Sequence, residues 1–148
     1  MRDVEELATL AVDCGFWIHK ELGPGPLETV YEAVMEASLV RRGVFVERQK
    51  PIAIEFDGMV LGEGFRADLL LESRLIIEIK SIDRLAPVHG RQLLTYLRLT
   101  KQPLGLLMNF GGGTFREGLK RVVNNHGPFA SSRLRVNQIS APEPPAAE

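Results

Sequence analysis

Two neighbouring apolar segments carry ionisable residues where a buried β-strand should have none. Residues 65–72 contain Asp68, and residues 75–80 contain Glu78 and Lys80. An unpaired charge inside a protein costs on the order of several kcal/mol, so these charges need partners. A divalent cation held by Asp68 and Glu78, with Lys80 beside it, would satisfy them. An ion pair between Glu78 and Lys80 on a solvated sheet face explains the same pattern, and the two segments alone do not separate these interpretations.

The composition is that of one ordinary globular domain. The chain has 148 residues, of which 45% are hydrophobic and 25% are charged. Its apolar runs fall far short of the ~20 residues that span a bilayer, and its acidic start does not resemble a signal peptide. We therefore expect a cytoplasmic protein with no membrane partner. A single cysteine, Cys14, excludes an internal disulfide and a cysteine-ligated metal site.

The charges are unevenly distributed along the chain. Residues 1–64 contain six Lys or Arg and 12 Asp or Glu, for a net charge of −6, whereas residues 65–148 contain 12 and seven, for a net charge of +5. The basic part contains both apolar segments with ionisable residues. This asymmetry favours a nucleic-acid ligand, although random variation of surface charge explains it as readily.

Apolar spacing predicts two helices followed by a sheet. Helical periodicity covers residues 3–22 and about 27–42. Residues 115–123 fit either a helix or a short helix followed by a strand. A single domain is expected at 1–126, and the composition of the remaining residues, 127–148, predicts a disordered tail. Further strands are predicted at 44–48, 52–56, 59–61, 65–72, 75–81 and 104–110, with a helix at 87–100.

Three connections shape the predicted sheet. Asp57-Gly58 is a strong hairpin-turn signal, whereas residues 62–64, Gly-Glu-Gly, predict a break between two strands. The helix at 87–100 links two strands, which predicts a parallel pair with a crossover helix on one face. The chain is therefore expected to form an α/β fold, with a mixed β-sheet flanked by helices.

The turn between the two charged segments sets their predicted register. Ser73-Arg74 reads as a two-residue turn. That turn would place Asp68 nearly opposite residue 79, and Glu78 would then be an adjacent or diagonal neighbour. Glu78 and Lys80 are two residues apart on one strand, so they should share a face.

The residue types at this position suit phosphodiester chemistry. The carboxylates of Asp68 and Glu78 are hard oxygen ligands for Mg²⁺ or Mn²⁺, and the carbonyl of Ile79 offers a third ligand. Lys80 is placed to position a water or to stabilise charge that develops at phosphorus. A bound metal would lower the pKa of its water, so this set predicts metal-assisted phosphodiester hydrolysis.

Two motifs in order resemble a known group of nucleases. Asp68 followed by residues 78–80, Glu-Ile-Lys, resembles the signature of the PD-(D/E)xK nuclease superfamily, with Ala67 in place of the usual proline. Residues 25–31 resemble the motif of the narrower GxxExxY family, and the likeness extends over about residues 4–124. The resemblance implies a restriction-endonuclease-like fold with an α-β-β-β-α-β core. It also implies a nuclease that acts on nucleic acid, most simply DNA.

The resemblance also implies a role for the helix before the sheet. Glu28 matches an acidic residue that often joins the metal site in that superfamily, directly or through water. The simpler explanation of Glu28 is its favourable position in the first turn of a helix. Tyr31 lies three residues further on the same face, where it would support Glu28 and help to bind substrate, or would pack in the core.

Gln92 and Tyr96 resemble the QxxxY motif of RecB-type exonucleases, in which it contacts substrate or supports the site. They are four residues apart and share one helix face with His89. For His89, a role behind the metal ligands or at the helix end is favoured over metal binding.

Three arginines spaced by seven residues predict a basic stripe beside these residues, if the helix reaches far enough at both ends. Arg84, Arg91 and Arg98 would then contact a phosphate backbone. A solvated helix face is the alternative. A non-catalytic module that binds nucleic acid or protein on the same fold also remains open, and a partner protein or homo-oligomer would supply specificity.

Overall fold

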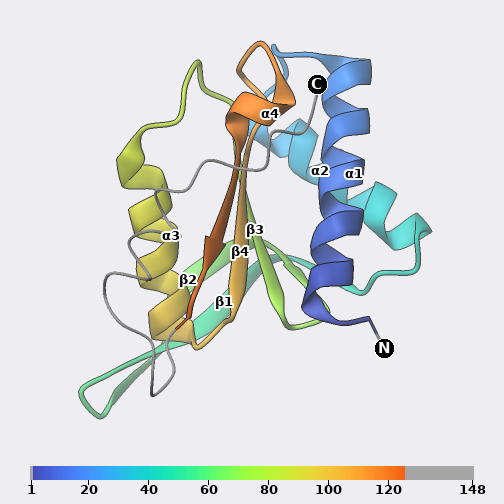
Figure 1. Cartoon of the computed structure of the whole chain (residues 1–148). Coiled ribbons are helices and arrows are strands. Elements are labelled where there is room, and N and C mark those ends of the chain that lie inside the picture. The colour runs from blue at the N-terminus through green and yellow to red at the C-terminus, as the bar shows by residue number, and fades with distance from the viewer. Residues whose placement is uncertain (1, 126–148) are drawn as a thin grey trace.

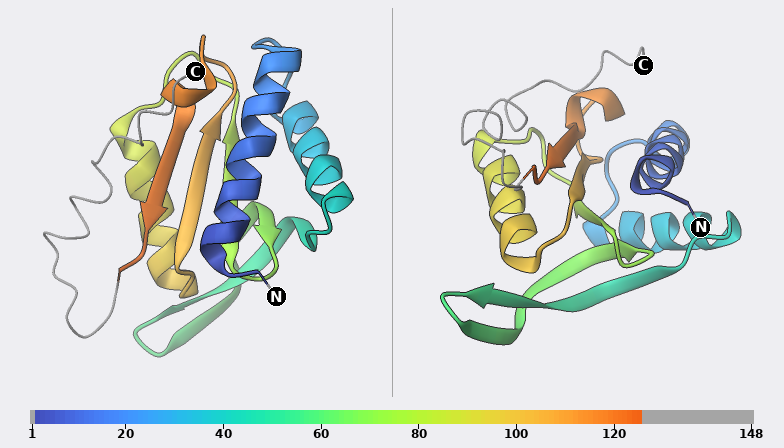
Figure 2. Two further views of the ribbon diagram at one scale, coloured as in Figure 1. Left: turned by 45° about the vertical axis from the view of Figure 1, so that its right-hand side comes forward. Right: turned by 60° about the horizontal axis from the view of Figure 1, so that its bottom comes forward.

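The computed structural model describes residues 2–125, which form a five-stranded mixed sheet between helices. Two helices, α1 and α2, cover one face, and α3 covers the other (Figure 1 and Figure 2). This arrangement confirms the predicted fold class. Residues 127–148, predicted as a tail, lie outside the described part of the chain. The elements are α1 (Val4–Leu22), α2 (Glu28–Arg41), β1 (Val46–Phe56), β2 (Met59–Leu71), β3 (Leu75–Lys80), α3 (Pro87–Thr100), β4 (Leu104–Asn109), α4 (Phe115–Gly118) and β5 (Leu119–Val123).

Both N-terminal helices match their predicted ranges to within one residue at each end. Helix α1 begins after Asp3, whose carboxylate accepts the Glu6 N–H while the Glu6 carboxylate accepts the Asp3 N–H. This reciprocal pair satisfies two N–H groups that the first helical turn leaves without a backbone partner. The helix ends at Gly23, whose φ of 66° glycine adopts without strain.

The first two strands form one long hairpin. Asp57-Gly58 is its turn, as predicted, and both residues have positive φ. The prediction of four separate strands here is wrong, because β1 and β2 are each continuous. Pro51 is tolerated inside β1 because β1 is an edge strand. At residues 62–64, predicted as a break, three residues of β2 face the single Ala53 of β1, so the irregularity is absorbed within the pairing.

The connection between β2 and β3 is one residue longer than predicted. Leu71 pairs with Leu75, so the turn holds three residues, and Glu72 and Ser73 both have positive φ. Leu69 pairs with Ile77. Continuing that register by one step sets Asp68 opposite Glu78, whereas the sequence predicted residue 79. The extra turn residue therefore places the two carboxylates on directly facing positions.

The crossover through α3 is confirmed. Strands β3 and β4 are parallel, and α3 connects them and packs on one face of the sheet through Leu93, Leu94 and Leu97. Residues 115–123 adopt the second predicted alternative, a short helix followed by a strand that pairs antiparallel with β4. No helix within residues 2–125 is long and apolar enough to cross a membrane.

The packing of α1 against α4 gives a stability prediction. A Cβ built on Gly15 would lie 2.3 Å from Cζ of Phe115, whose fully buried ring is held by an edge contact with Phe16. We expect Gly15→Ala to lower the free energy of unfolding by about 1–3 kcal/mol despite the better helix propensity of alanine. Urea unfolding followed by circular dichroism measures this change. Thr9→Ala, on the exposed side of α1, is the control, and equal stability of the two variants would contradict the expected clash.

Candidate active site

The two carboxylates predicted as metal ligands meet where the pairing of β2 and β3 ends. The Asp68 N–H donates to Oε2 of Glu78 at 2.9 Å, and the Ile79 N–H donates to Oδ2 of Asp68 at 2.8 Å. Side-chain oxygens thus take the place of the next backbone pair of the sheet. Each carboxylate is thus fixed by a backbone N–H through one of its oxygens. The remaining oxygen of Glu78, Oε1, accepts no hydrogen bond from any other described residue.

Burial and mutual repulsion make this pair unfavourable as two charges. The pKa of Glu78 is raised from 4.5 to about 8, first by burial and then by the negative charge of Asp68. The pKa of Asp68 is also raised, chiefly by burial, with the charges of Glu32 and Glu28 adding to it. A cation between the two carboxylates would remove both penalties.

Lys80 lies two residues beyond Glu78 and helps to line a cavity of about 70 Å³ between the sheet and α3. Its positive charge opposes the rise in the Glu78 pKa. Among the described residues, Lys80 forms no direct ion pair, so its ammonium group is available to a water or a phosphate oxygen. The α3 residues that line the same cavity are His89, Gln92, Leu93 and Tyr96.

The residues predicted on α3, His89, Gln92 and Tyr96, therefore line the same cavity as Glu78 and Lys80, but their contacts differ. Tyr96 stacks on Phe65 of β2, with ring centroids 4.3 Å apart, and Gln92 is exposed. Nδ1 of His89 accepts the Ala86 N–H at 2.9 Å, a bond that caps the start of the helix. The contact of His89 is the helix-end one favoured above.

Glu28 lies at the edge of this site. It is exposed in the first turn of α2, and its Oε2 is 3.4 Å from the N–H of Ser81, the residue after Lys80. It is close enough to Asp68 for its charge to raise the Asp68 pKa. The first turn of α2 thus faces the end of β3, as the sequence predicted. Glu28 itself lies outside the hydrogen-bonded pair formed by Asp68 and Glu78.

Sequence reasoning missed a second acidic residue on α2. Glu32 is only 4% exposed, and its Oε1 accepts a hydrogen bond from Nε of Arg48 at 2.7 Å. The Nε2 of Gln49 lies 3.1 Å from each Glu32 oxygen and 3.1 Å from Oδ1 of Asp68. Glu32 therefore orients the amide that holds the outer oxygen of Asp68. Its position one turn after Glu28, on the face turned to the sheet, was the available signal.

Two predicted substrate contacts take other positions. Tyr31 is fully buried, stacks on Phe110 at 4.5 Å, and donates its hydroxyl hydrogen bond to the Gly23 carbonyl. It supports the core and the loop before Glu28, which is the second role that the sequence left open. Because α3 begins only at Pro87, Arg84 lies outside it, and the predicted stripe of three arginines does not form on one helix. Arg91 is exposed on α3.

The donor set at the centre fits a hard divalent cation. Within residues 2–125, no group of three or more His, Cys, Asp or Glu side chains is placed to hold a metal. Two facing carboxylates, with the carbonyl of Ile79 between Glu78 and Lys80, nevertheless match the few protein ligands that Mg²⁺ takes while keeping several waters. Burial, with the negative charges nearby, raises the pKa of both acids, and a bound cation would favour their ionised forms.

Comparisons with known proteins agree with this geometry. The sequence model of the PD-(D/E)XK nuclease superfamily matches residues 5–122, which include both acids, Lys80 and all of α3. A search of curated proteins and a search of solved structures each found no match. Since the match covers most of the chain, the protein belongs to the PD-(D/E)XK nuclease superfamily.

Proposed function

We propose that this protein is a divalent-metal-dependent nuclease of the GxxExxY type that hydrolyses phosphodiester bonds in DNA. Membership of the superfamily supports a nuclease-like function and a nucleic-acid substrate, and nucleases of this superfamily generally use divalent metals. The observation that carries the proposal is the facing placement of Asp68 and Glu78, with Lys80 two residues further on the same strand.

Asp68, Glu78 and the Ile79 carbonyl would hold Mg²⁺ or Mn²⁺, and Glu28 would contribute through water. When bound, the ion would neutralise phosphate charge and lower the pKa of a ligated water. The backbone N–H groups of Asp68 and Ile79 keep the two carboxylates in place before any ligand arrives. This fixed geometry favours catalysis because little reorganisation is needed during the reaction.

Lys80 would act on the reacting phosphate. Its side chain lines the cavity beside Glu78, where it would orient the attacking water and stabilise charge on the phosphate oxygens. On the α3 side, Gln92 and Arg91 are exposed and would contact the nucleic-acid strand. Tyr96, stacked on Phe65, forms the wall of the cavity and would hold the strand against it.

Cleavage of single-stranded and plasmid DNA in Mn²⁺ or Mg²⁺ tests the function. We expect cleavage that EDTA abolishes and that Asp68→Asn lowers by about 10²–10³-fold, since the variant loses a charged ligand. Glu21→Gln, on the exposed side of α1, should cleave like the unmodified protein. Unchanged activity of Asp68→Asn would refute the assignment, and DNA binding with no cleavage under any metal would favour a non-catalytic binding module.

A further inference from the structure

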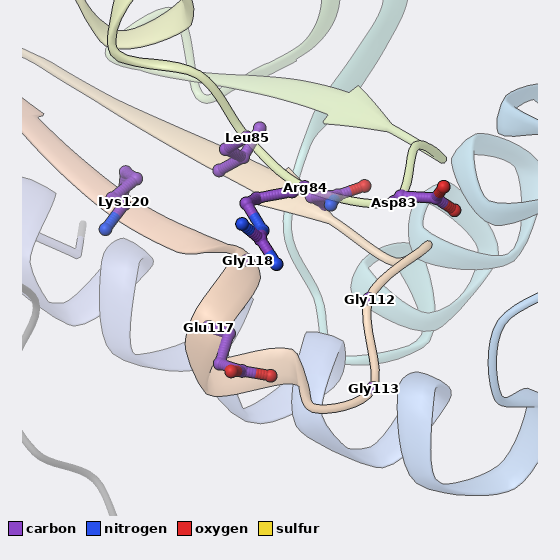
Figure 3. A pocket seen from close by; sticks show the side chains of 9 residues that line it. Asp83, Arg84, Leu85, Gly112, Gly113, Glu117, Gly118 and Lys120 are labelled. Atoms are coloured by element: carbon purple, nitrogen blue, oxygen red, sulfur yellow. The ribbon is translucent and has the colours of Figure 1, made fainter.

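A groove of about 510 Å³ lies between the loop that follows β3 and the chain from α4 to β5 (Figure 3). Two cations line it from different elements, Arg84 from the loop and Lys120 from β5. Within the described part of the chain, neither side chain has a hydrogen-bond or ion-pair partner. The groove therefore offers two cationic side chains that form no direct ion pair within residues 2–125.

Gly112, Gly113 and Gly118 help to line this groove, and a Cβ built on Gly113 would meet no atom within 4 Å. The loop on the other side of the groove is held by a side chain of β4. The buried amide of Asn109 accepts the Ile82 N–H at 2.9 Å and donates to the Ile82 carbonyl at 2.8 Å. These two hydrogen bonds to Asn109, the last residue of β4, fix the loop two residues before Arg84. The fold therefore sets the backbone position of Arg84.

The groove lies on the same face of the sheet as the acidic pair. Glu78 of β3 pairs with Leu107 of β4, and Leu107 pairs with Lys120 of β5. Directly paired residues share a face, and two strand spacings separate Glu78 from Lys120 by about 10 Å between Cα atoms. Arg84 follows Lys80 by four residues along the chain. Lys120 thus lies two strands from Glu78 on the face of the sheet where the cleaved phosphate would lie, and Arg84 lines the same groove as Lys120.

We propose that this groove binds a phosphate of the nucleic-acid strand adjacent to the one that is cleaved, with Arg84 and Lys120 as its ligands. The proposal rests on the proposed nuclease function and names a substrate contact for it. Guanidinium and ammonium groups form charge-assisted bonds to phosphate oxygens. Gly112 and Gly113, which line the groove and carry no side chain, leave room for the close approach of a sugar-phosphate chain.

Two carboxylates also line the groove and would oppose an anion. The carboxylates of Asp83 and Glu117 lie apart from the guanidinium of Arg84, Asp83 on the side of Gly112 and Glu117 on α4 (Figure 3). Glu117 accepts a hydrogen bond from the Thr114 hydroxyl at 3.0 Å. Because its charge repels phosphate, Glu117→Gln should tighten nucleic-acid binding.

Fluorescence anisotropy of a labelled single-stranded DNA oligonucleotide, measured in EDTA to prevent cleavage, tests the groove. We expect Arg84→Ala and Lys120→Ala each to weaken binding by about tenfold and to reduce the slope of log affinity against log salt by about 0.7. Lys20→Ala and Arg41→Ala, exposed cations on α1 and α2, should leave both quantities unchanged. Tighter binding by Glu117→Gln would support the same interpretation.

Equal affinity of Arg84→Ala, Lys120→Ala and the unmodified protein would overturn the proposal, as would a complete lack of DNA binding. Cleavage in Mn²⁺, assayed on the same samples, separates this result from the nuclease function. Active protein with unchanged affinity in both groove variants refutes the groove alone. Inactive protein whose binding depends on Arg84 and Lys120 refutes the nuclease function and supports the groove as a nucleic-acid contact.

Discussion

Lys80→Ala is expected to lower the rate of DNA cleavage by about 10³-fold while leaving metal binding intact. Within the described part of the chain, Lys80 is the only lysine or arginine that lines the cavity beside Glu78, and it has no ion-pair partner there that would hold it elsewhere. Its loss removes the positive charge that meets the reacting phosphate, but it removes no oxygen ligand. Single-turnover cleavage kinetics in saturating Mn²⁺ give the rate directly.

The matched control for Lys80 is Lys20→Ala, an exposed lysine on α1. It should cleave at the normal rate. Lys80→Arg keeps the charge but changes its shape and reach, so we expect it to recover only part of the activity. Lys80→Ala with near-normal cleavage would show that the lysine takes no part in the chemistry.

Glu78→Gln is expected to stabilise the metal-free protein at pH 8 and to remove a pH dependence of its stability. The pKa of Glu78 is 4.5 ordinarily and about 8 in the fold, so between these values the folded state binds the proton that the unfolded state has lost. The stability contributed is therefore complete below pH 4.5 and is lost as the pH rises through 8. By linkage the loss is roughly 3–5 kcal/mol, and glutamine, which never ionises, avoids it.

Urea unfolding in EDTA at several values between pH 5 and pH 8 measures this effect. The free energy of unfolding should fall with pH in the unmodified protein and fall much less in Glu78→Gln. Asp68 contributes in the same direction because burial raises its pKa too. Glu21→Gln, an exposed carboxylate on α1, should reproduce the unmodified profile. Parallel profiles for Glu78→Gln and the unmodified protein would contradict the raised pKa.

The residues at the centre of the site were predictable because each carries its signal locally. Asp68 and Glu78 are ionisable groups inside apolar strands, which stand out in any sequence of this composition. The parallel pair of β3 and β4 followed from the single helix between them. The register between β2 and β3 did not follow, because Glu72 and Ser73 adopt positive φ in a three-residue turn, a conformation that their residue types do not announce.

The parts that sequence missed depend on contacts between distant segments. Glu32 reaches Asp68 only through Gln49, which lies 17 residues later on β1. Lys120 lies two strands from Glu78 because β4 pairs with β3 and β5 pairs with β4. No local sequence pattern predicts which residues of these strands face each other. Arg84 would have joined the arginine stripe only if the helix predicted at 87–100 reached back that far. The helix begins at Pro87, and the hydrogen bonds between Asn109 and Ile82 hold the loop of Arg84 at the groove.

The central claim is that Asp68 and Glu78 together hold one divalent cation. Calorimetric titration of Mn²⁺ into the metal-free protein at pH 7 tests it most directly. Binding should occur at one ion per chain and release up to one proton, because Glu78 is protonated at this pH and must ionise to bind the metal. Asp68→Asn and Glu78→Gln should each abolish the site, while Lys80→Ala should retain it. Absence of Mn²⁺ binding, or binding that persists unchanged in both carboxylate variants, would contradict the account.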